Sequence, residues 1–498
     1  MTLKKNIIAS YASQIYITFI GIIILPLYIR YMGAEAYGLV GFFAMLQVWF
    51  NLLDFGLTPT IGRETARFRA GVWNALDFRR LFRALNSVFI LIAFIGGGGL
   101  FLLSGFIAED WLKTQDLSFA EVQLALQIMA FSVALRWMCG LYRGVINGSE
   151  MLVWLGGFNA IIATLRFVVI LPVMWNFGAT PTVFFIYQLL VAILQISVLF
   201  FKTRTLLPIL SDEHRIDWSF TPVKPLLKFA LTIAFTSSVW VLVTQTDKFV
   251  LSGILPLEEY GYFSIAVLVA SGVMMINGPI STAIMPRMAK MDAEGDHAGL
   301  IHIYRQSTQL VAIIAAAICI TLTFYAEPLL WIWTNDKTLT HYAVPILVLY
   351  TIGNGILAVS AFPYYLQYAK GDLRLHLIGN VGFIMLLIPA IIWSAIKYGG
   401  IGAGYAWLVM NVIYFIAWVP VIHNKFEPGL NLLWFGRDVV VIIMVATIVG
   451  YGLFSTLPQI ESRFWLVITV IGFGVLIMLS GASVSSVVWE KAHKFIDH

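Results

Sequence analysis

The sequence is divided into apolar runs of about 20 residues or more, separated by short polar segments. Each run is long enough to cross the hydrocarbon core of a bilayer as an α-helix. The runs are continuous, whereas the strands of a membrane barrel would alternate apolar and polar residues. Only 11% of the residues are charged and 60% are hydrophobic, while about a quarter of an ordinary soluble sequence is charged. The predicted fold class is therefore an all-α polytopic membrane protein.

Fourteen membrane spans are predicted, and the first is expected to be retained because it is too long for the apolar core of a signal peptide. The predicted spans are 7–30, 37–57, 84–106, 121–146, 152–176, 180–201, 227–251, 261–285, 308–333, 342–368, 374–396, 401–422, 438–456 and 464–486.

Lysine and arginine are distributed unevenly over the loops between these spans. With the N-terminus inside, 23 of the 31 fall in inside segments or near the inner ends of spans, five in outside segments or at an outer span end, and three deeper within spans. Short loops rich in these residues remain in the cytoplasm. We therefore expect both termini to be cytoplasmic.

The remaining composition excludes several classes of function. The net charge of +5 is spread over many loops and forms no basic tail, so no nucleic-acid partner is expected. The two cysteines, Cys139 and Cys319, lie inside apolar runs and predict neither a disulfide nor a metal site. No histidine pattern has metal-ligand spacing, and no phosphate-binding loop for ATP occurs. No cofactor is therefore expected.

An internal repeat relates the two halves of the chain. Glu35 and Gly38 in the turn "MGAEAYGLVGF" correspond to Glu258 and Gly261 in "LPLEEYGYFSI", at an offset of 223 residues. Similar offsets relate further pairs, which are Arg63 with Arg287, Arg83 with Arg305 and Gly148 with Gly371. The unit holds six spans, an even number, so its two copies have the same orientation in the membrane. Parallel repeats of this kind are found in transporters that work by alternating access.

The repeat predicts the domain boundaries. We expect two pseudo-symmetric six-helix bundles at 1–201 and 227–423, joined by a cytoplasmic linker at 202–226. Two further helices and a tail, 424–498, lie outside the repeat.

Two segments resemble one known family. These are "TQTDKFVLSGILPLEEYGYFSIAVLVA" at 244–270 and "ASQIYITFIGIIILPLYIRYMGAEAYGLVGFFAMLQVWFNLLDFGL" at 12–57. They resemble polysaccharide transporters of the MOP exporter superfamily, specifically Wzx-type flippases of lipid-linked oligosaccharide. Both the fourteen spans and the six-helix repeat fit that family.

The resemblance implies a function. Such a protein would flip undecaprenyl-pyrophosphate-linked repeat units from the cytoplasmic to the periplasmic leaflet of the bacterial inner membrane. The units would serve surface polysaccharide such as O-antigen, lipopolysaccharide or exopolysaccharide. A V-shaped cationic cavity between the bundles, no metal, and a polymerase and chain-length regulator as candidate partners are also implied.

Two arginines lie in the middle of predicted spans. Arg136 ("FSVALRWMCG") and Arg166 ("ATLRFVVIL") have no acidic residue within a helical turn. A charge inside the membrane is costly and usually faces the protein interior or water. We expect both to face a cavity and to bind pyrophosphate or an acidic sugar, for which the fork of a guanidinium is suited. The alternative is a structural bond to backbone carbonyls or to a distant acid such as Asp54.

Other charged residues are candidates with stronger structural alternatives. Asp247 and Lys248 point about 100° apart on a helix, so they are not expected to pair. Lys248 would reach substrate, and Asp247 would gate, couple an ion or hold its helix. Arg30 would line the cavity or anchor the outer interface. Asp54 would take part in ion coupling or gating.

Two further cations come from the inside loops. Arg63 and its repeat partner Arg287 would form an entry site for a diphosphate, or belong to the general inside-positive collar.

Two other functions compete with a flippase. A cation-coupled multidrug exporter of the same superfamily would be expected to have twelve spans and acidic sites. A membrane-embedded polymerase or glycosyltransferase would be expected to have large outside loops, but the longest one here, 107–120, has only 14 residues and no convincing catalytic pair. We therefore predict a transporter and not an enzyme.

Overall fold

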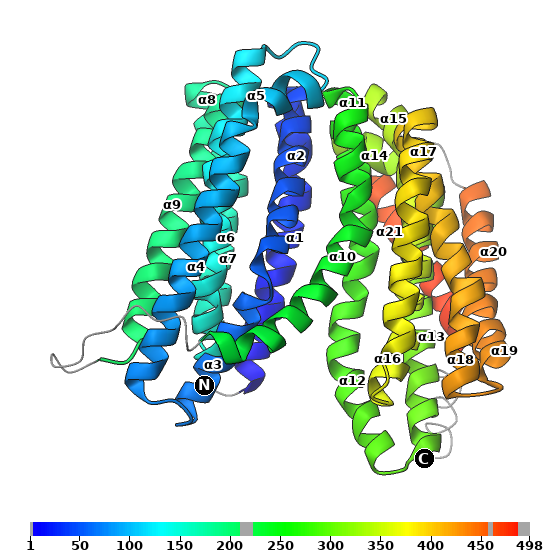
Figure 1. The fold of residues 1–498 in the computed structure, drawn as a ribbon. Coiled ribbons are helices and arrows are strands. Elements are labelled where there is room, and N and C mark those ends of the chain that lie inside the picture. Colours follow the sequence, from blue (N-terminus) through cyan, green and yellow to red (C-terminus); the bar gives the residue numbers. More distant parts are fainter. Residues whose placement is uncertain (1–2, 210–222, 457–461, 487–498) are drawn as a thin grey trace. The chain divides into compact units, whose positions relative to one another are not determined.

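The computed structural model describes residues 3–209, 223–456 and 462–486, which are almost entirely helical (Figure 1). Within these residues there is no β-strand, and one isolated bridge joins Lys113 to Pro256. The all-α fold class is confirmed. Short 3-10 and π segments are labelled η. The elements are α1 (Leu3–Met32), α2 (Ala34–Phe50), η1 (Asn51–Asp54), α3 (Leu57–Arg69), α4 (Ala75–Leu102), α5 (Ser104–Phe106), η2 (Ile107–Trp111), α6 (Phe119–Gly148), α7 (Leu152–Thr164), η3 (Leu165–Val169), α8 (Ile170–Phe177), α9 (Pro181–Leu206), η4 (Lys224–Leu226), α10 (Leu227–Ile254), α11 (Leu257–Ser271), η5 (Gly272–Ile276), α12 (Asn277–Ala293), α13 (His297–Phe324), α14 (Ala326–Thr334), α15 (Lys337–Val359), α16 (Phe362–Ala369), α17 (Arg374–Ile413), η6 (Tyr414–Trp418), α18 (Val419–Phe426), α19 (Leu430–Leu433), η7 (Trp434–Val440), α20 (Val441–Ser455) and α21 (Arg463–Ser483).

The described residues contain 12 helical segments that are long and apolar enough to cross a membrane. One of them, Arg374–Phe426, contains two predicted spans, because the chain turns at Gly399 with φ 59° and ψ −141°. The predicted span 227–251 corresponds to α10, which is not among the 12. The protein is therefore a multi-pass membrane protein with about the predicted number of spans.

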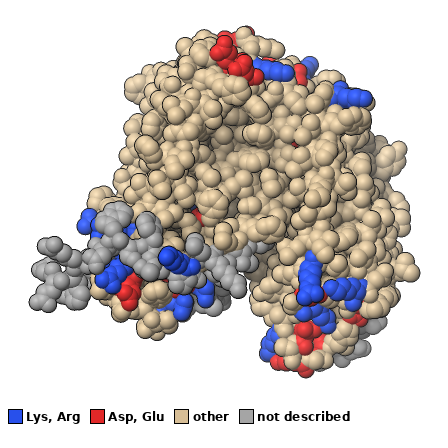
Figure 2. Space-filling view, in the orientation of Figure 1, with Lys and Arg blue, Asp and Glu red and all other residues tan. Residues whose placement is uncertain are grey.

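The chain forms two compact units, Met1–Gly261 and Tyr262–His498. Within each unit most of the long helices run roughly side by side (Figure 1). On the face in Figure 2, charged side chains gather toward the ends of the helices and are scarce between them, as expected for membrane spans. α10 belongs to the first unit, and residues 210–222 of the predicted linker lie outside the described residues. The predicted domain boundaries stay a prediction.

The repeat is visible in the helix bounds. α4 and α13 both have 28 residues, and their starts differ by 222 positions in the chain. Each begins with a side-chain cap, since Asn74 accepts a hydrogen bond from the Asp77 amide and Asp296 accepts one from the Gly299 amide. Each is preceded by a membrane helix interrupted by a 3-10 segment, η1 or η5. The two halves therefore share a side-chain cap at the start of this helix and a 3-10 interruption in the helix before it.

A stripe of glycines on α6 receives α3. Gly140, Gly144 and Gly148 are spaced four apart, a pattern that lets helix backbones approach closely. A Cβ on Gly144 would lie 2.8 Å from the carbonyl oxygen of Thr58, and one on Gly148 would lie 2.2 Å from that of Gly62. This packing fixes the short helix α3 against α6 in the first unit.

A methyl group at Gly148 should disrupt this contact. We expect Gly148→Ala to lower the free energy of unfolding by about 1–3 kcal/mol, because one backbone must move away from the other. Thermal unfolding of the full chain in detergent would measure the change. Gly98→Ala in α4 is the matched control, since a Cβ there meets no atom within 4 Å. Equal unfolding temperatures for the two variants would contradict the close packing.

The start of α2 is held by the loop that follows η2. The carboxylate of Glu35, which is 8% exposed, accepts hydrogen bonds from three successive amides. These are the amides of Gln115 at 2.6 Å, Asp116 at 2.8 Å and Leu117 at 3.1 Å. The acid that marks this turn in the sequence therefore satisfies backbone amides of the loop.

A buried polar network joins the last two helices to α13 in the second unit. Asp438, which is fully buried, accepts hydrogen bonds from Arg305 Nε at 2.6 Å and from a terminal nitrogen of Arg305 at 2.9 Å. Gln309 donates to the same carboxylate at 2.6 Å and also bonds Ser485 and Ser486 after α21. The Trp434 indole donates to Thr308 at 3.0 Å. The last two helices are thus fastened to α13 by its polar side chains.

Candidate functional site

The site begins at a break in the second membrane helix. After η1, Phe55 and Gly56 have φ values of 45° and 70°, both in the left-handed region. The chain then restarts as α3, and the carboxylate of Asp54 accepts hydrogen bonds from the amide of Thr58 at 3.2 Å and from its hydroxyl at 2.5 Å. Asp54 therefore satisfies a free amide in the first turn of α3, whose N-cap residue is Gly56. Interrupted membrane helices in corresponding positions of two halves commonly mark the binding site of a transporter.

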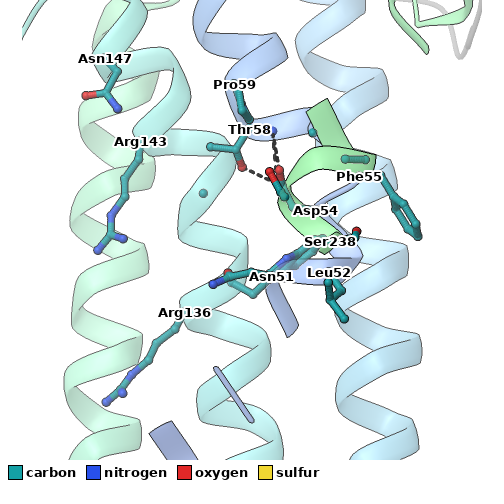
Figure 3. Close-up of a pocket in the computed structure, with 15 residues that line it drawn as sticks. Asn51, Leu52, Asp54, Phe55, Thr58, Pro59, Arg136, Arg143, Asn147 and Ser238 are labelled. Carbon is teal, nitrogen blue, oxygen red and sulfur yellow. Dashed lines mark hydrogen bonds between the residues drawn. The ribbon is translucent and has the colours of Figure 1, made fainter. Parts of the chain in front are cut away.

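Two adjoining cavities lie beside this break, within the first unit. The larger has a volume of about 380 Å³, and the smaller of about 180 Å³. They share Asn51, Arg136, Trp137 and Arg143. The other residues of the larger cavity come from η1, α3, α6 and α10 (Figure 3); they are Leu52, Asp54, Phe55, Gly56, Thr58, Pro59, Gly140, Asn147, Ala234, Ser237 and Ser238. The smaller cavity adds Gln47, Val133, Arg166 and Gln195.

Two of the arginines come from one face of α6. Arg136 and Arg143 are seven residues apart, which is two helical turns, so their side chains leave the helix one above the other. Figure 3 shows them at successive levels of α6, with Asn147 beyond Arg143. The third, Arg166, comes from η3. Three cationic side chains thus meet around one pair of cavities in the membrane-spanning part.

The partners of these arginines are neutral. Arg136 donates to Gln47 Oε1 at 2.9 Å and to Gln188 Oε1 at 2.5 Å. Its guanidinium also lies 4.7 Å from the centre of the Phe43 ring. Arg166 donates to Gln195 Oε1.

Arg143 has no hydrogen-bond or ion-pair partner in the described part of the chain. None of the three arginines forms an ion pair with a described acidic residue.

Several buried donors around the cavities lack an acceptor among the described residues. They are Nε of Arg136, Nε of Arg143, Nε of Arg166, Nε1 of Trp137 and Nε2 of Gln195. Buried polar atoms are normally hydrogen-bonded, and an unpaired group costs free energy. Guanidinium and indole groups can only donate. The ligand that would satisfy this set is an anion with several oxygens, such as a diphosphate.

A π segment carries Arg166. Such a segment frees carbonyl groups from the regular helical pattern, and side chains bond them here. The carbonyl of Leu165 accepts from Tyr187 at 2.8 Å, that of Arg166 from Gln188 at 3.0 Å and that of Phe167 from Tyr28 at 2.9 Å. The irregular backbone is therefore fixed by three neighbouring side chains.

Three of the predicted site residues come together around the cavities. Arg136 lines both, Asp54 lines the larger and Arg166 the smaller. Arg30 is exposed at the end of α1, and Arg63 is exposed on α3, 3.8 Å from Glu64. Neither lines these cavities. Arg287 is exposed on α12 in the second unit.

The neighbours Asp247 and Lys248 form an ion pair, contrary to the expectation from their positions on the helix. Lys248 Nζ lies 3.3 Å from Asp247 Oδ1 and donates to the Thr244 carbonyl at 2.7 Å. The flexible stem of lysine folds back along α10, which the angle between adjacent positions does not capture. Asp247 is 2% exposed, and neither residue lines the two cavities. Their predicted roles in substrate binding and ion coupling stay predictions.

Four functional candidates were missed from the sequence. Arg143 was counted only among the inside charges, because it lies near the inner end of the predicted span 121–146, but in the structure it lines both cavities. Its spacing of seven from Arg136 was the available signal. The other three, Gln47, Gln188 and Gln195, are uncharged, so the search for charged residues within spans did not find them. The spacing of seven between Gln188 and Gln195 in an apolar helix was again the available pattern.

Comparison with known proteins identifies related sequences. The sequence profile of a family described as "Polysaccharide biosynthesis protein" matches residues 3–292. A "Putative O-antigen transporter" from Shigella flexneri is 20% identical over 413 residues, which are 83% of this chain and 96% of that protein.

Solved structures share the fold. "Lipid II flippase MurJ, inward closed conformation" has a TM-score of 0.72 and 16% identity, over 96% of this chain and 98% of that one. A multidrug resistance MATE family transporter of the MOP superfamily, in an inward-facing conformation, has a TM-score of 0.64 and 11% identity, over 84% and 96%. At these identities the likeness shows that the chain shares the fold of these structures.

Proposed function

Because the chain belongs to the family of polysaccharide biosynthesis proteins, we propose that it flips lipid-linked oligosaccharide repeat units across the membrane. On this proposal the chain is a multi-pass transporter and not an enzyme, in keeping with its similarity to a putative O-antigen transporter. The proposed direction is from the cytoplasmic to the periplasmic leaflet of the bacterial inner membrane, with both termini in the cytoplasm. The proposed carrier is undecaprenyl pyrophosphate, and the product would serve surface polysaccharide.

The observation that carries this proposal is the excess of donors around the two cavities. Arg136, Arg143 and Arg166 have neutral partners or none among the described residues, so their charge is available to a ligand. A pyrophosphate group offers several oxygens and negative charge, which match the fork of a guanidinium. We assign these three arginines to the pyrophosphate of the substrate.

A multidrug exporter for cationic compounds fits this site less well. Such a ligand would be repelled by three arginines, and its desolvated charge would need acidic partners. Asp54 is the one acidic residue among those that line the two cavities, and its carboxylate is engaged by Thr58. We keep ion coupling or gating through Asp54 as a proposal for the energy source.

A deletion strain tests the function. Loss of the gene should remove a surface polysaccharide and cause lipid-linked repeat units to accumulate on the cytoplasmic side. Plasmid-borne wild-type protein should restore both. An intact surface polysaccharide together with altered resistance to cationic drugs would support the exporter instead. Repeat units that reach the periplasm but remain unpolymerised would contradict a flippase.

A further inference from the structure

Two glutamines on α9 bond two of the arginines at successive levels of the helix. Gln188 and Gln195 are seven residues apart, so they leave the same face of α9 two turns apart. They are 4% and 1% exposed. Gln188 holds Arg136 and Gln195 holds Arg166, each through an amide oxygen. A buried guanidinium is more commonly paired with a carboxylate, which compensates its charge.

The second unit contains such a compensated arginine. Arg305 makes two hydrogen bonds to the buried carboxylate of Asp438, and this pair ties helices together. The charge of Arg305 is thereby matched within the protein. The same chain thus holds Arg305 with a carboxylate, but Arg136 and Arg166 with amides.

We propose that Gln188 and Gln195 are positioning residues, which orient the guanidinium groups of Arg136 and Arg166 while leaving their positive charge for the diphosphate of the substrate. This inference rests on the proposed function. An amide oxygen accepts a hydrogen bond as a carboxylate does, but it brings no negative charge that would compete with the ligand. A carboxylate at either position would occupy the arginine as an internal anion.

The two glutamines differ in how many hydrogen bonds their amide groups make, so Gln195 is the better position for a test. Gln188 Nε2 donates to the Arg166 carbonyl at 3.0 Å, so its whole amide is in use. Gln195 Nε2 has no partner among the described residues. Gln195→Glu therefore keeps the acceptor, loses no hydrogen bond that the described residues make, and adds one negative charge. A purely structural role for Gln195 would tolerate this change, whereas the proposed role would not.

Binding of inorganic pyrophosphate to the full-length protein in detergent, measured by calorimetry, tests the inference. We expect Gln195→Glu to weaken pyrophosphate affinity by at least about tenfold while thermal stability is kept or raised, because a new ion pair replaces a neutral bond. Gln195→Met should weaken affinity by only a few-fold, because it removes the orientation but not the charge. Gln127→Glu is the matched control: it adds the same charge to α6 at a position that lines neither cavity, and affinity should be unchanged.

The outcomes separate this inference from the proposed function. If the wild-type protein binds pyrophosphate and Gln195→Glu binds it equally well, the inference is wrong and the flippase proposal stands. If the wild-type protein does not bind pyrophosphate, the anion site itself is wrong. If Gln195→Glu fails to fold, Gln188→Glu provides the second test, because it places the same charge beside Arg136. On the proposed role, this variant must also lose affinity for pyrophosphate. Unchanged affinity in that variant would overturn the inference.

Discussion

Replacing Arg136 with alanine should reduce the transfer of lipid-linked repeat units by about tenfold to a hundredfold. Hydrogen bonds to a charged group contribute about 1.5–3 kcal/mol, and 1.4 kcal/mol corresponds to a factor of ten. Arg136 lines both cavities, so its loss removes a charge from the proposed anion site as a whole. The measurement is restoration of surface polysaccharide in the deletion strain, with the accumulated lipid-linked units quantified in the same cells.

Lysine at the same position separates charge from geometry. Arg136→Lys keeps the positive charge, but an ammonium group cannot reproduce the planar fork that reaches both Gln47 and Gln188. We therefore expect partial restoration. Arg204→Ala is the control, because Arg204 is an exposed arginine near the end of α9, stacked on Phe200, and lines neither cavity. That variant should restore surface polysaccharide fully.

The stability of the Arg136→Ala variant decides how a loss of polysaccharide is interpreted. Arg136→Ala removes a partly buried cation together with its two bonds to amide oxygens, so a large loss of stability is not expected. Variant protein that reaches the membrane at normal levels but does not restore polysaccharide would support a role in binding. Full restoration by Arg136→Ala would contradict the assignment of this site to the substrate.

The sequence predicts most of the fold because the membrane imposes a simple rule. Backbone groups in the bilayer must be satisfied internally, so long apolar runs become helices. The offset of the repeat likewise predicts that α4 and α13 correspond, and their lengths agree. The left-handed break at Phe55 and Gly56 was not predicted. It depends on how Asp54 bonds the first turn of α3 and how α3 packs on the glycines of α6, and neither contact is local in the apolar pattern.

The site was predicted only in part, because an apolar pattern reveals the charged residues that interrupt it but not how side chains are arranged around a cavity. Arg136 and Arg166 were found because a charge in the middle of an apolar run is rare. Arg143 lies near the inner end of its predicted span and was counted only among the inside charges, but it leaves α6 two turns after Arg136 and lines the same cavities. The glutamines that hold the arginines are neutral, so their importance became visible only from their hydrogen bonds.

The second large effect is expected in the other unit, where Asp438→Ala should strongly destabilise the protein. Removing this carboxylate leaves Arg305 as an uncompensated charge and deprives Gln309 of a partner, at a cost of about 3–5 kcal/mol. Because Gln309 also bonds Ser485 and Ser486, the attachment of the last two helices to α13 should weaken. Thermal unfolding of the full chain in detergent would measure the loss, and polysaccharide restoration should fall with the amount of folded protein.

A double variant and an exposed ion pair provide the controls for Asp438. Arg305→Met with Asp438→Leu removes both charges together, so its stability should lie well above that of Asp438→Ala. Lys290→Ala breaks the exposed pair with Glu294, at 3.5 Å, and should cost no more than about 1 kcal/mol. An unfolding temperature of Asp438→Ala equal to that of Lys290→Ala would contradict the role of the network. The expected difference would establish that the buried pair of Arg305 and Asp438 holds helices of the second unit together, which an exposed pair does not do.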